Sequence, residues 1–398
     1  MPRTNFVPFT GNTLNTDPGL FFPEVMIGTR SYEAFPLYGE QKNVGAIDAS
    51  LFASNGIQCF VYSIGTDIYQ TGTAATTVKN GTLAAAAVGA TTLTYTVTTT
   101  TAAPAVGDYL QIGPAKGKFG SLTKPTATTT AAKTTAFVTK VISVSGTGPY
   151  TLTVAAIPKA VAANAVAQAV KAPFYHFVQQ ASILPSMSIE KNLGGPSAIG
   201  GQSLLYGGCR VGKYSIKAAT SNTEATFTAT ITAQSVQIVT SPTTLQFVTE
   251  LPFVFAEYTL TWNTVTMHEA SNLSVDITNG LKPIYCFNGS HELQFAPLTQ
   301  LKVTGSFTGV WDSLNSGTYA LWNQMLTAHD AKLEFTMHHL TGGTAVRLVM
   351  THARLAKDTI DPKMADVIME KVSFSAYQKL STPAMISAVV ANSVNLGY

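Results

Sequence analysis

The sequence is poor in charge and in cysteine. Only 11% of its 398 residues are charged, against roughly a quarter in an ordinary soluble domain, and the net charge is only +3. The three cysteines (Cys59, Cys209 and Cys286) lie far apart without a CxxC pair, which argues against a disulfide framework. No segment approaches the ~18 uninterrupted apolar residues of a membrane-spanning helix, and the N-terminus lacks the apolar run of a signal peptide. We therefore expect a protein made and folded in a cytoplasm.

The familiar patterns of catalytic and metal sites are also missing. There is no HExxH, no GxSxG and no evident pair of acid–base carboxylates. Adjacent His338 and His339 would point to opposite faces of a strand and so cannot share a metal. Gly207–Tyr214 (GGCRVGKY) is close to a phosphate-binding loop, but a tyrosine replaces the hydroxyl residue after the lysine and a strand is expected to follow. We expect no enzyme activity, no cofactor and no metal site.

One long region has its own composition. No glutamate occurs between Glu40 and Glu190, and Thr and Ala dominate from about residue 71 to residue 172. Within it, alternating apolar residues predict strands at residues 91–97, 108–112, 137–144 and 150–154. We interpret residues 66–173 as an inserted small β module. Its unbalanced lysines either keep it soluble or contact an anionic partner.

The stretch from Phe253 to Phe307 organises the rest of the chain. Apolar and polar residues alternate there with a period of two, and Asn-Gly pairs at residues 279–280 and 288–289 separate the segments. This pattern predicts an antiparallel sheet. The apolar set is Tyr258, Leu260, Trp262, Leu273, Val275, Ile277, Leu301, Val303 and Phe307.

Other elements follow from local patterns. Helical spacing predicts helices at residues 44–53 and 314–329, and residues 57–64 are predicted to be a strand. Residues 332–339 and 344–350 are predicted to form a hairpin, followed by a strand at 367–377 and a tail at 381–398. Residues 1–25 predict an extended arm that lies against a neighbouring domain or subunit. Its aromatic residues are Phe6, Phe9, Phe21 and Phe22.

The chain outside the insertion divides into two halves of similar plan. The first comprises residues 26–65 and 174–245, and the second comprises residues 246–380. Residues 214–231 resemble residues 258–277 in pattern, since each has a strand, a polar turn containing Ser-Asn and an alternating strand. We treat an internal duplication as a hypothesis.

Five segments from Pro185 onward occur in a characteristic order. They are PSMSIEKNLGG (185–195), LYGGCRVGKYSI (205–216), FAEYTLTW (255–262), LSVDITNGLKPIY (273–285) and LKVTGSFTGVWD (301–312). In this order of elements, the chain resembles the tail tube (major tail) proteins of long-tailed, non-contractile bacteriophages. The resemblance covers most of the chain outside residues 66–173 and involves no catalytic signature.

This resemblance implies a β-sandwich with a flanking helix, whose strands join those of neighbouring copies into rings. Stacked rings would form the hollow tail of a virion, through which genomic DNA leaves. A ring of six tube folds needs six chains, or three if each chain holds two folds. The implied partners are the chain itself, the tape measure protein and DNA in the lumen, and the tail terminator and tail tip proteins.

Open sheet edges invite pairing with another copy, and ring closure removes them. We therefore expect the nine apolar residues given above to lie in intersubunit sheet and the four arm phenylalanines to help stack rings. The insertion should project outward. The alternative is a β-sandwich surface or appendage adhesin that binds host or glycan, against which the missing secretion signal argues.

Overall fold

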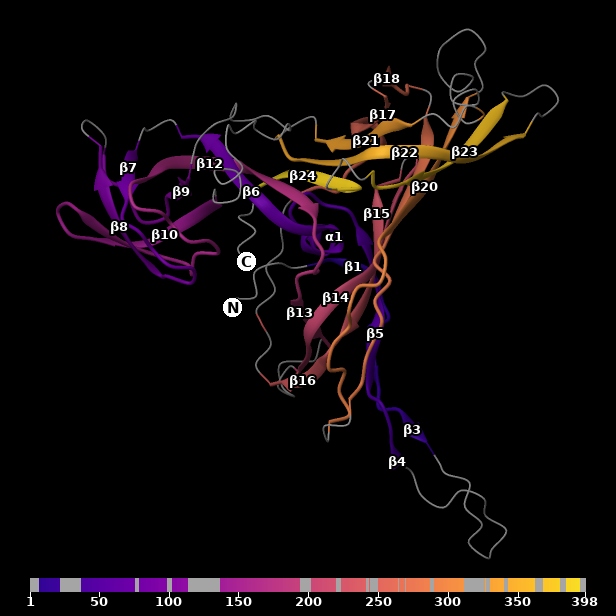
Figure 1. Ribbon diagram of the computed structural model, residues 1–398, viewed down its shortest axis with the longest axis horizontal. Helices are drawn as coiled ribbons and strands as arrows, with labels where there is room; N and C mark the ends of the chain where they lie inside the picture. Colours follow the sequence, from indigo (N-terminus) through magenta and orange to yellow (C-terminus); the bar gives the residue numbers. More distant parts are fainter. Residues whose placement is uncertain are drawn as a thin grey trace, which may run out of the picture.

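The computed structural model describes residues 7–21, 37–75, 79–98, 102–113, 137–193, 202–219, 223–240, 243, 250–263, 265–268, 270–286, 290–310, 326, 330–339, 343–361, 368–379 and 384–393. In these ranges the chain is mainly β with one α-helix, α1, as the sequence predicts for the fold class. Figure 1 shows a large β-structure, a smaller one beside it and a thin arm that extends away from the large one.

The first layer of the large structure is an antiparallel sheet that we call the repeat sheet. Its order is β1/β2–β5–β15–β14–β19–β20–β23–β22, with β1 and β2 end to end along β5. Its strands are β1 (Phe9–Asn12), β2 (Asn15–Asp17), β5 (Lys42–Ser50), β14 (Ser203–Ala218), β15 (Thr226–Ala233), β19 (Ser271–Thr278), β20 (Lys302–Val310), β22 (Ala345–Asp361) and β23 (Met369–Ala376).

The second layer, the back sheet, has the order β18–β17–β21–β22–β24–β12–β6. Strand β22 belongs to both layers, because residues 345–350 pair with β21 and β24 whereas residues 353–361 pair with β23. The predicted hairpin (β21 with β22) and the predicted strand at 367–377 (β23) are confirmed. The remaining strands are β6 (Gly65–Ala74), β12 (Ala165–Gln180), β17 (Tyr258–Trp262), β18 (Val265–Thr266), β21 (Ala331–His338) and β24 (Ile386–Asn392).

The main core lies between these layers and contains α1 (Ile57–Ile64). The sequence predicted a strand there and a helix at 44–53, and both predictions are wrong. Ile57, Phe60, Val61 and Ile64 have helical spacing and are almost fully buried. Conversely, residues 42–50 form β5, because Ile47, Ala49, Leu51 and Ala53 are all buried at period two. The small alanines hid that alternation.

Shorter elements extend from the sandwich. The first half of β14 pairs with β13 (Met187–Asn192) on one side and with β16 (Ser235–Val239) on the other. Strands β3 (Leu20–Phe21) and β4 (Leu37–Tyr38) pair in the thin arm of Figure 1. A 3-10 turn, η2 (Phe255–Glu257), precedes β17.

The smaller structure is a closed six-stranded antiparallel barrel. Its strands pair in the cyclic order β12–β7–β8–β11–β10–β9–β12, so none of the six is left with an open side. A separate apolar cluster that includes Tyr95, Phe137 and Leu152 fills it. The strands are β7 (Asn80–Leu83), β8 (Thr92–Val97), β9 (Tyr109–Ile112), β10 (Phe137–Ser145), β11 (Tyr150–Val154) and the start of β12.

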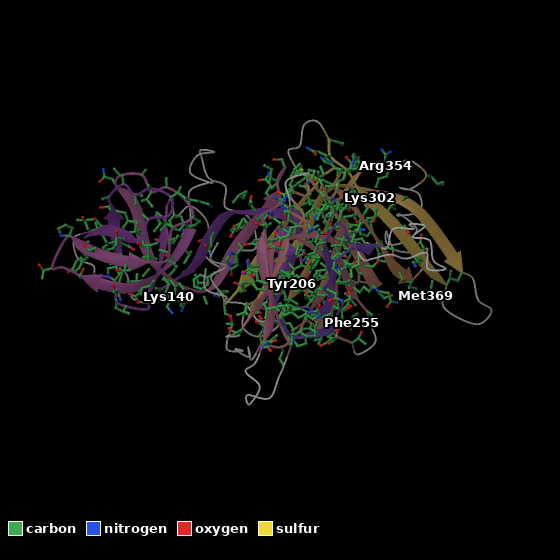
Figure 2. All side chains as sticks on the ribbon, turned by 90° about the horizontal axis from the view of Figure 1, so that it is seen from below. Lys140, Tyr206, Phe255, Lys302, Arg354 and Met369 are labelled. Carbon is green, nitrogen blue, oxygen red and sulfur yellow. The ribbon has the colours of Figure 1, made fainter. Side chains whose placement is uncertain are left out.

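Two strands and a few buried polar side chains join barrel and sandwich. Strand β12 contributes residues 165–170 to the barrel and continues beside β6 and β24 in the back sheet. The buried Gln111 side chain accepts a hydrogen bond from Thr71 Oγ1 (2.8 Å), and Val138 N donates to Gln70 Oε1 (3.1 Å). Figure 2 shows Lys140 on the barrel near one end of the molecule and Met369 toward the other end.

The structure corrects both predicted ends. Residues 386–392 do not form a tail but the buried strand β24 between β12 and β22. The N-terminal arm lies on its own chain, since β1 and β2 pair with β5 and Leu14 is fully buried. The predicted helix at 314–329 lies outside the described residues apart from Leu326.

Candidate assembly interface

The repeat sheet contains the same strand arrangement twice, and the long β-arms show this first. In the first arm, Leu20 pairs with Tyr38, and Gly39 N donates to Gly19 O (2.9 Å). In the second arm, Leu281 pairs with Leu298, and Thr299 N donates to Gly280 O (3.1 Å). Both glycines have positive φ, 61° for Gly19 and 53° for Gly280. The two arms therefore leave the sheet through the same kind of turn.

The strands that follow the arms match residue for residue. KNVGAIDAS in β5 corresponds to KVTGSFTGV in β20. The shared glycine is required in both, because an added Cβ would lie 2.3 Å from Leu14 Cα at Gly45 and 2.3 Å from Ser274 O at Gly305. Gly45 pairs with Ile231 of β15, and Gly305 pairs with Phe374 of β23. Strands β5 and β20 are therefore equivalent, and so are the strands β15 and β23 with which they pair.

The next hairpin repeats as well, including its irregularity. Strand β14 shifts register against β15 between Val211 and Lys213, and β22 shifts against β23 between Leu355 and Lys357. Arg210 and Arg354 precede the two bulges. RVGKYSIK (210–217) therefore corresponds to RLAKDTID (354–361).

These correspondences define two repeat units. The first unit is β1/β2–β5–β15–β14, and the second unit is β19–β20–β23–β22. They support an internal duplication, but the correspondence predicted from sequence, between residues 214–231 and residues 258–277, is wrong. Residue 214 corresponds to Asp358, and β19 corresponds to β1/β2.

The two units join through β14 and β19, which pair antiparallel from Lys213–Thr278 to Ala218–Leu273. Ser215 Oγ donates to Asp276 Oδ1, and Lys213 Nζ lies 3.3 Å from the same oxygen. Tyr214, Ile216 and Val275 fill the core below this contact. We call this contact the internal joint.

The outer edges of the repeat sheet have no second strand partner among the described residues. Along β22, residues 354–361 pair only with β23, and β1 and β2 pair only with β5. An open edge of this kind is a template for another strand. These edges, rather than the middle of the sheet, are the candidate assembly interface.

One face of the repeat sheet is polar throughout its central strands. Alternation turns the apolar residues to the core and small hydroxyl or charged residues to the other face. The polar residues are Lys213, Ser215 and Lys217 in β14, Thr226, Thr228, Thr230 and Thr232 in β15, Ser274, Asp276 and Thr278 in β19, Lys302, Thr304, Ser306 and Thr308 in β20, and Lys371, Ser373 and Ser375 in β23.

The nine residues predicted to lie in intersubunit sheet serve the chain's own fold. Seven of them are buried in the main core, and Tyr258 and Leu301 pack against it. Strands β19 and β20 have partners of this chain on both sides, so they offer no edge to a neighbour along their paired residues. The alternation was interpreted correctly as sheet, but it could not show which strands are at an edge.

The four arm phenylalanines are only partly described. Phe9 in β1 is 49% exposed and borders the candidate interface. Phe21 lies in β3, in the arm. Phe6 and Phe22 lie outside the described residues. Ring stacking by these residues stays a prediction.

Two of the three cysteines and the phosphate-loop-like run lie in packed parts of the fold. Burial raises the pKa of the Cys59 and Cys209 thiols to about 12, so both are protonated and unreactive. The GGCRVGKY run lies inside strand β14 and has no helix after it. Among the described residues, no cluster of His, Cys, Asp and Glu could hold a metal ion, and no helix is long and apolar enough to cross a membrane.

Comparison with known proteins supports the structural interpretation. A family model described as phage tail tube protein matches residues 142–376, well over half of the chain. The matched part begins in barrel strand β10 and ends with β23, so it includes the internal joint and all of the second unit. A search of curated proteins finds no match. On the strength of the family model, the chain belongs to the phage tail tube protein family.

Proposed function

We propose that this protein is the structural subunit of a long, non-contractile phage tail and assembles into stacked rings around a continuous channel. The duplicated repeat sheet is the observation that carries the proposal. One unit ends where the next begins, and the two outer edges are left without strand partners in the described structure. A sheet that repeats by translation in this way can close only by adding further copies.

Two units in one chain set the expected ring composition. If each unit occupies one position of a six-fold ring, three chains complete it. The polar face of the repeat sheet would line the channel, where Thr and Ser hydroxyls wet the wall between the lysines Lys213, Lys217, Lys302 and Lys371. Genomic DNA and the tape measure protein would occupy this channel in turn, with the terminator and tip proteins at its two ends.

Electron microscopy of the purified protein tests this proposal. We expect rings or hollow tubes in negative stain, and class averages with three-fold symmetry and six similar inner units. A protein that stays monomeric at high concentration, with no rings or tubes, would contradict it. Rings of six chains would retain the tube function but refute the composition of three.

A further inference from the structure

The internal joint shows how one unit pairs with the next, and the outer edges carry the same two elements. Residues 354–361 of β22 correspond to residues 210–217 of β14, which form one side of the internal joint. Residues 13–17 correspond to residues 274–278 of β19, which form the other side. Leu14 and Val275 hold equivalent places beside Gly45 and Gly305, and both are fully buried.

From this correspondence, we infer that residues 357–361 of one copy pair antiparallel with residues 13–17 of the next copy, in the register of the internal joint. The pairs are Lys357 with Asp17, Thr359 with Asn15, and Ile360 with Leu14. They correspond to Lys213–Thr278, Ser215–Asp276 and Ile216–Val275 within the chain. This inference rests on the proposed function and specifies the surface through which identical copies meet.

The chemistry of the paired residues is complementary. By residue type, Lys357 and Asp17 have opposite charge, and the polar pair Thr359 and Asn15 takes the place of Ser215 and Asp276 in the internal joint. Thr13, Asn15 and Asp17 are exposed, so they are accessible to an incoming strand.

Side chains protect the edge in the single chain. Leu14 N donates to Asn12 Oδ1 (2.9 Å), and Leu14 O accepts a hydrogen bond from Lys191 Nζ (2.9 Å). A protected edge resists unspecific pairing. When the neighbouring strand binds, its backbone hydrogen bonds replace these two contacts of Leu14. Only a strand in the correct register can replace both, so the protected edge favours the matching strand.

Disulfide trapping tests the register directly. In a Cys286→Ser background, which removes the exposed native thiol, Asn15→Cys is combined with Thr359→Cys. After assembly and mild oxidation, we expect a ladder of covalent dimers and trimers on non-reducing gels. The pair Asp17→Cys with Lys357→Cys should give the same ladder. The mismatched pair Asp17→Cys with Thr359→Cys is displaced by two residues and should give at least tenfold less.

An internal pair calibrates the chemistry. Ser215→Cys with Asp276→Cys occupies the equivalent position in the internal joint and should close within one chain. If tubes form and this internal pair closes but neither matched outer pair gives a ladder, or the mismatched pair gives more, the inferred joint is wrong and the proposed function stands. If the unmodified protein forms no rings or tubes, both fail.

Discussion

Nδ1 of His176 lies 2.9 Å from Oδ2 of Asp67, and both side chains are buried between the strands of the back sheet. Asn392 completes the group, because its Nδ2 donates to Ala53 O (3.2 Å) and its Oδ1 lies 3.2 Å from His176 Nε2. Both ring nitrogens therefore lie within hydrogen-bonding distance of a side-chain oxygen. This group connects β6, β12 and β24 next to the strands that lead into the barrel.

Removal of Asp67 should destabilise the sandwich strongly. In an Asp67→Ala variant the buried imidazole and the Phe177 amide both lose their contact with Asp67, and we expect the free energy of unfolding to fall by about 2–5 kcal/mol. Urea denaturation of the unassembled chain measures this. The control is Lys213→Ala, which removes an ion pair whose side chains are 46% and 38% exposed and should cost less than about 1 kcal/mol. Equal losses in the two variants would contradict the prediction.

The stability of the β21–β22 hairpin should depend on pH through Glu334. Burial alone would raise the pKa of the Glu334 carboxyl, but hydrogen bonds from Lys332 and Arg347 outweigh it and hold the pKa below its ordinary value. Because the folded pKa is the lower one, this stabilisation is complete above the unfolded pKa of about 4.3 and is lost as the pH falls through the folded pKa.

Denaturation curves at pH 5, 4 and 3 measure this loss. We expect the free energy of unfolding to decline less steeply with falling pH in Glu334→Gln than in the unmodified chain. Glu40→Gln alters an exposed carboxyl in the first arm and serves as the control. If Glu334→Gln retained the full slope, the ion pairs would not be its source.

The repeat predicts which glycines tolerate a side chain. In Gly305→Ala the new methyl group would lie 2.3 Å from Ser274 O and 2.4 Å from Phe374 Cζ, so we expect a loss of about 1–3 kcal/mol. Gly212 has the same place in the first unit as Ala356 in the second, and its nearest neighbour would be Leu281 Cδ1 at 3.4 Å. Gly212→Ala should therefore change the free energy of unfolding by less than about 0.5 kcal/mol. A reversed order would refute the correspondence between the units.

The barrel should be removable without loss of the sandwich. Ala74 and Val170 are opposite each other in the ladder of β6 and β12, so residues 75–169 can be replaced by an Asn-Gly turn. We expect the shortened chain to fold and to form tubes of smaller outer diameter in negative stain. Phe174 would lose its contact with Tyr109 and become exposed at a cost of about 2 kcal/mol, so a second version carries Phe174→Thr. If both versions failed to fold, the barrel would be an integral part of the sandwich.

Much of the architecture could be predicted from alternation alone. The strands around Leu260, Val275 and Phe307 lie where the period-two pattern placed them. Asn279-Gly280 marks the start of the second arm rather than a tight hairpin turn, and Asn288-Gly289 lies outside the described residues. The sequence predicted a helix where β5 lies and a strand where α1 lies. The buried face of β5 has alanine at alternate positions, so its alternation is not visible when only large apolar residues are considered. A short segment buried on nearly all sides, such as α1, gives the same apolar run as a buried strand.

The duplication was harder to locate because the insertion separates its two parts. Lys42 corresponds to Lys302, but Arg210 corresponds to Arg354, so no single offset aligns both stretches. The pairs KNVG/KVTG and RVGK/RLAK were visible in the sequence, but each is too short to stand out. Edge strands could not be predicted at all, because edge position depends on the order of strands in space.

The barrel is inserted between β5 and β14 of the first unit, whereas only residues 311–344 separate β20 from β22 in the second unit. Because one polypeptide contains both units, every unit with a barrel is joined to a unit without one. In the proposed ring of three chains, every second unit would therefore carry a barrel on its outside. Three barrels would then have more space around the ring than six barrels would have. This spacing would arise from one type of chain, without a second type that lacks the barrel.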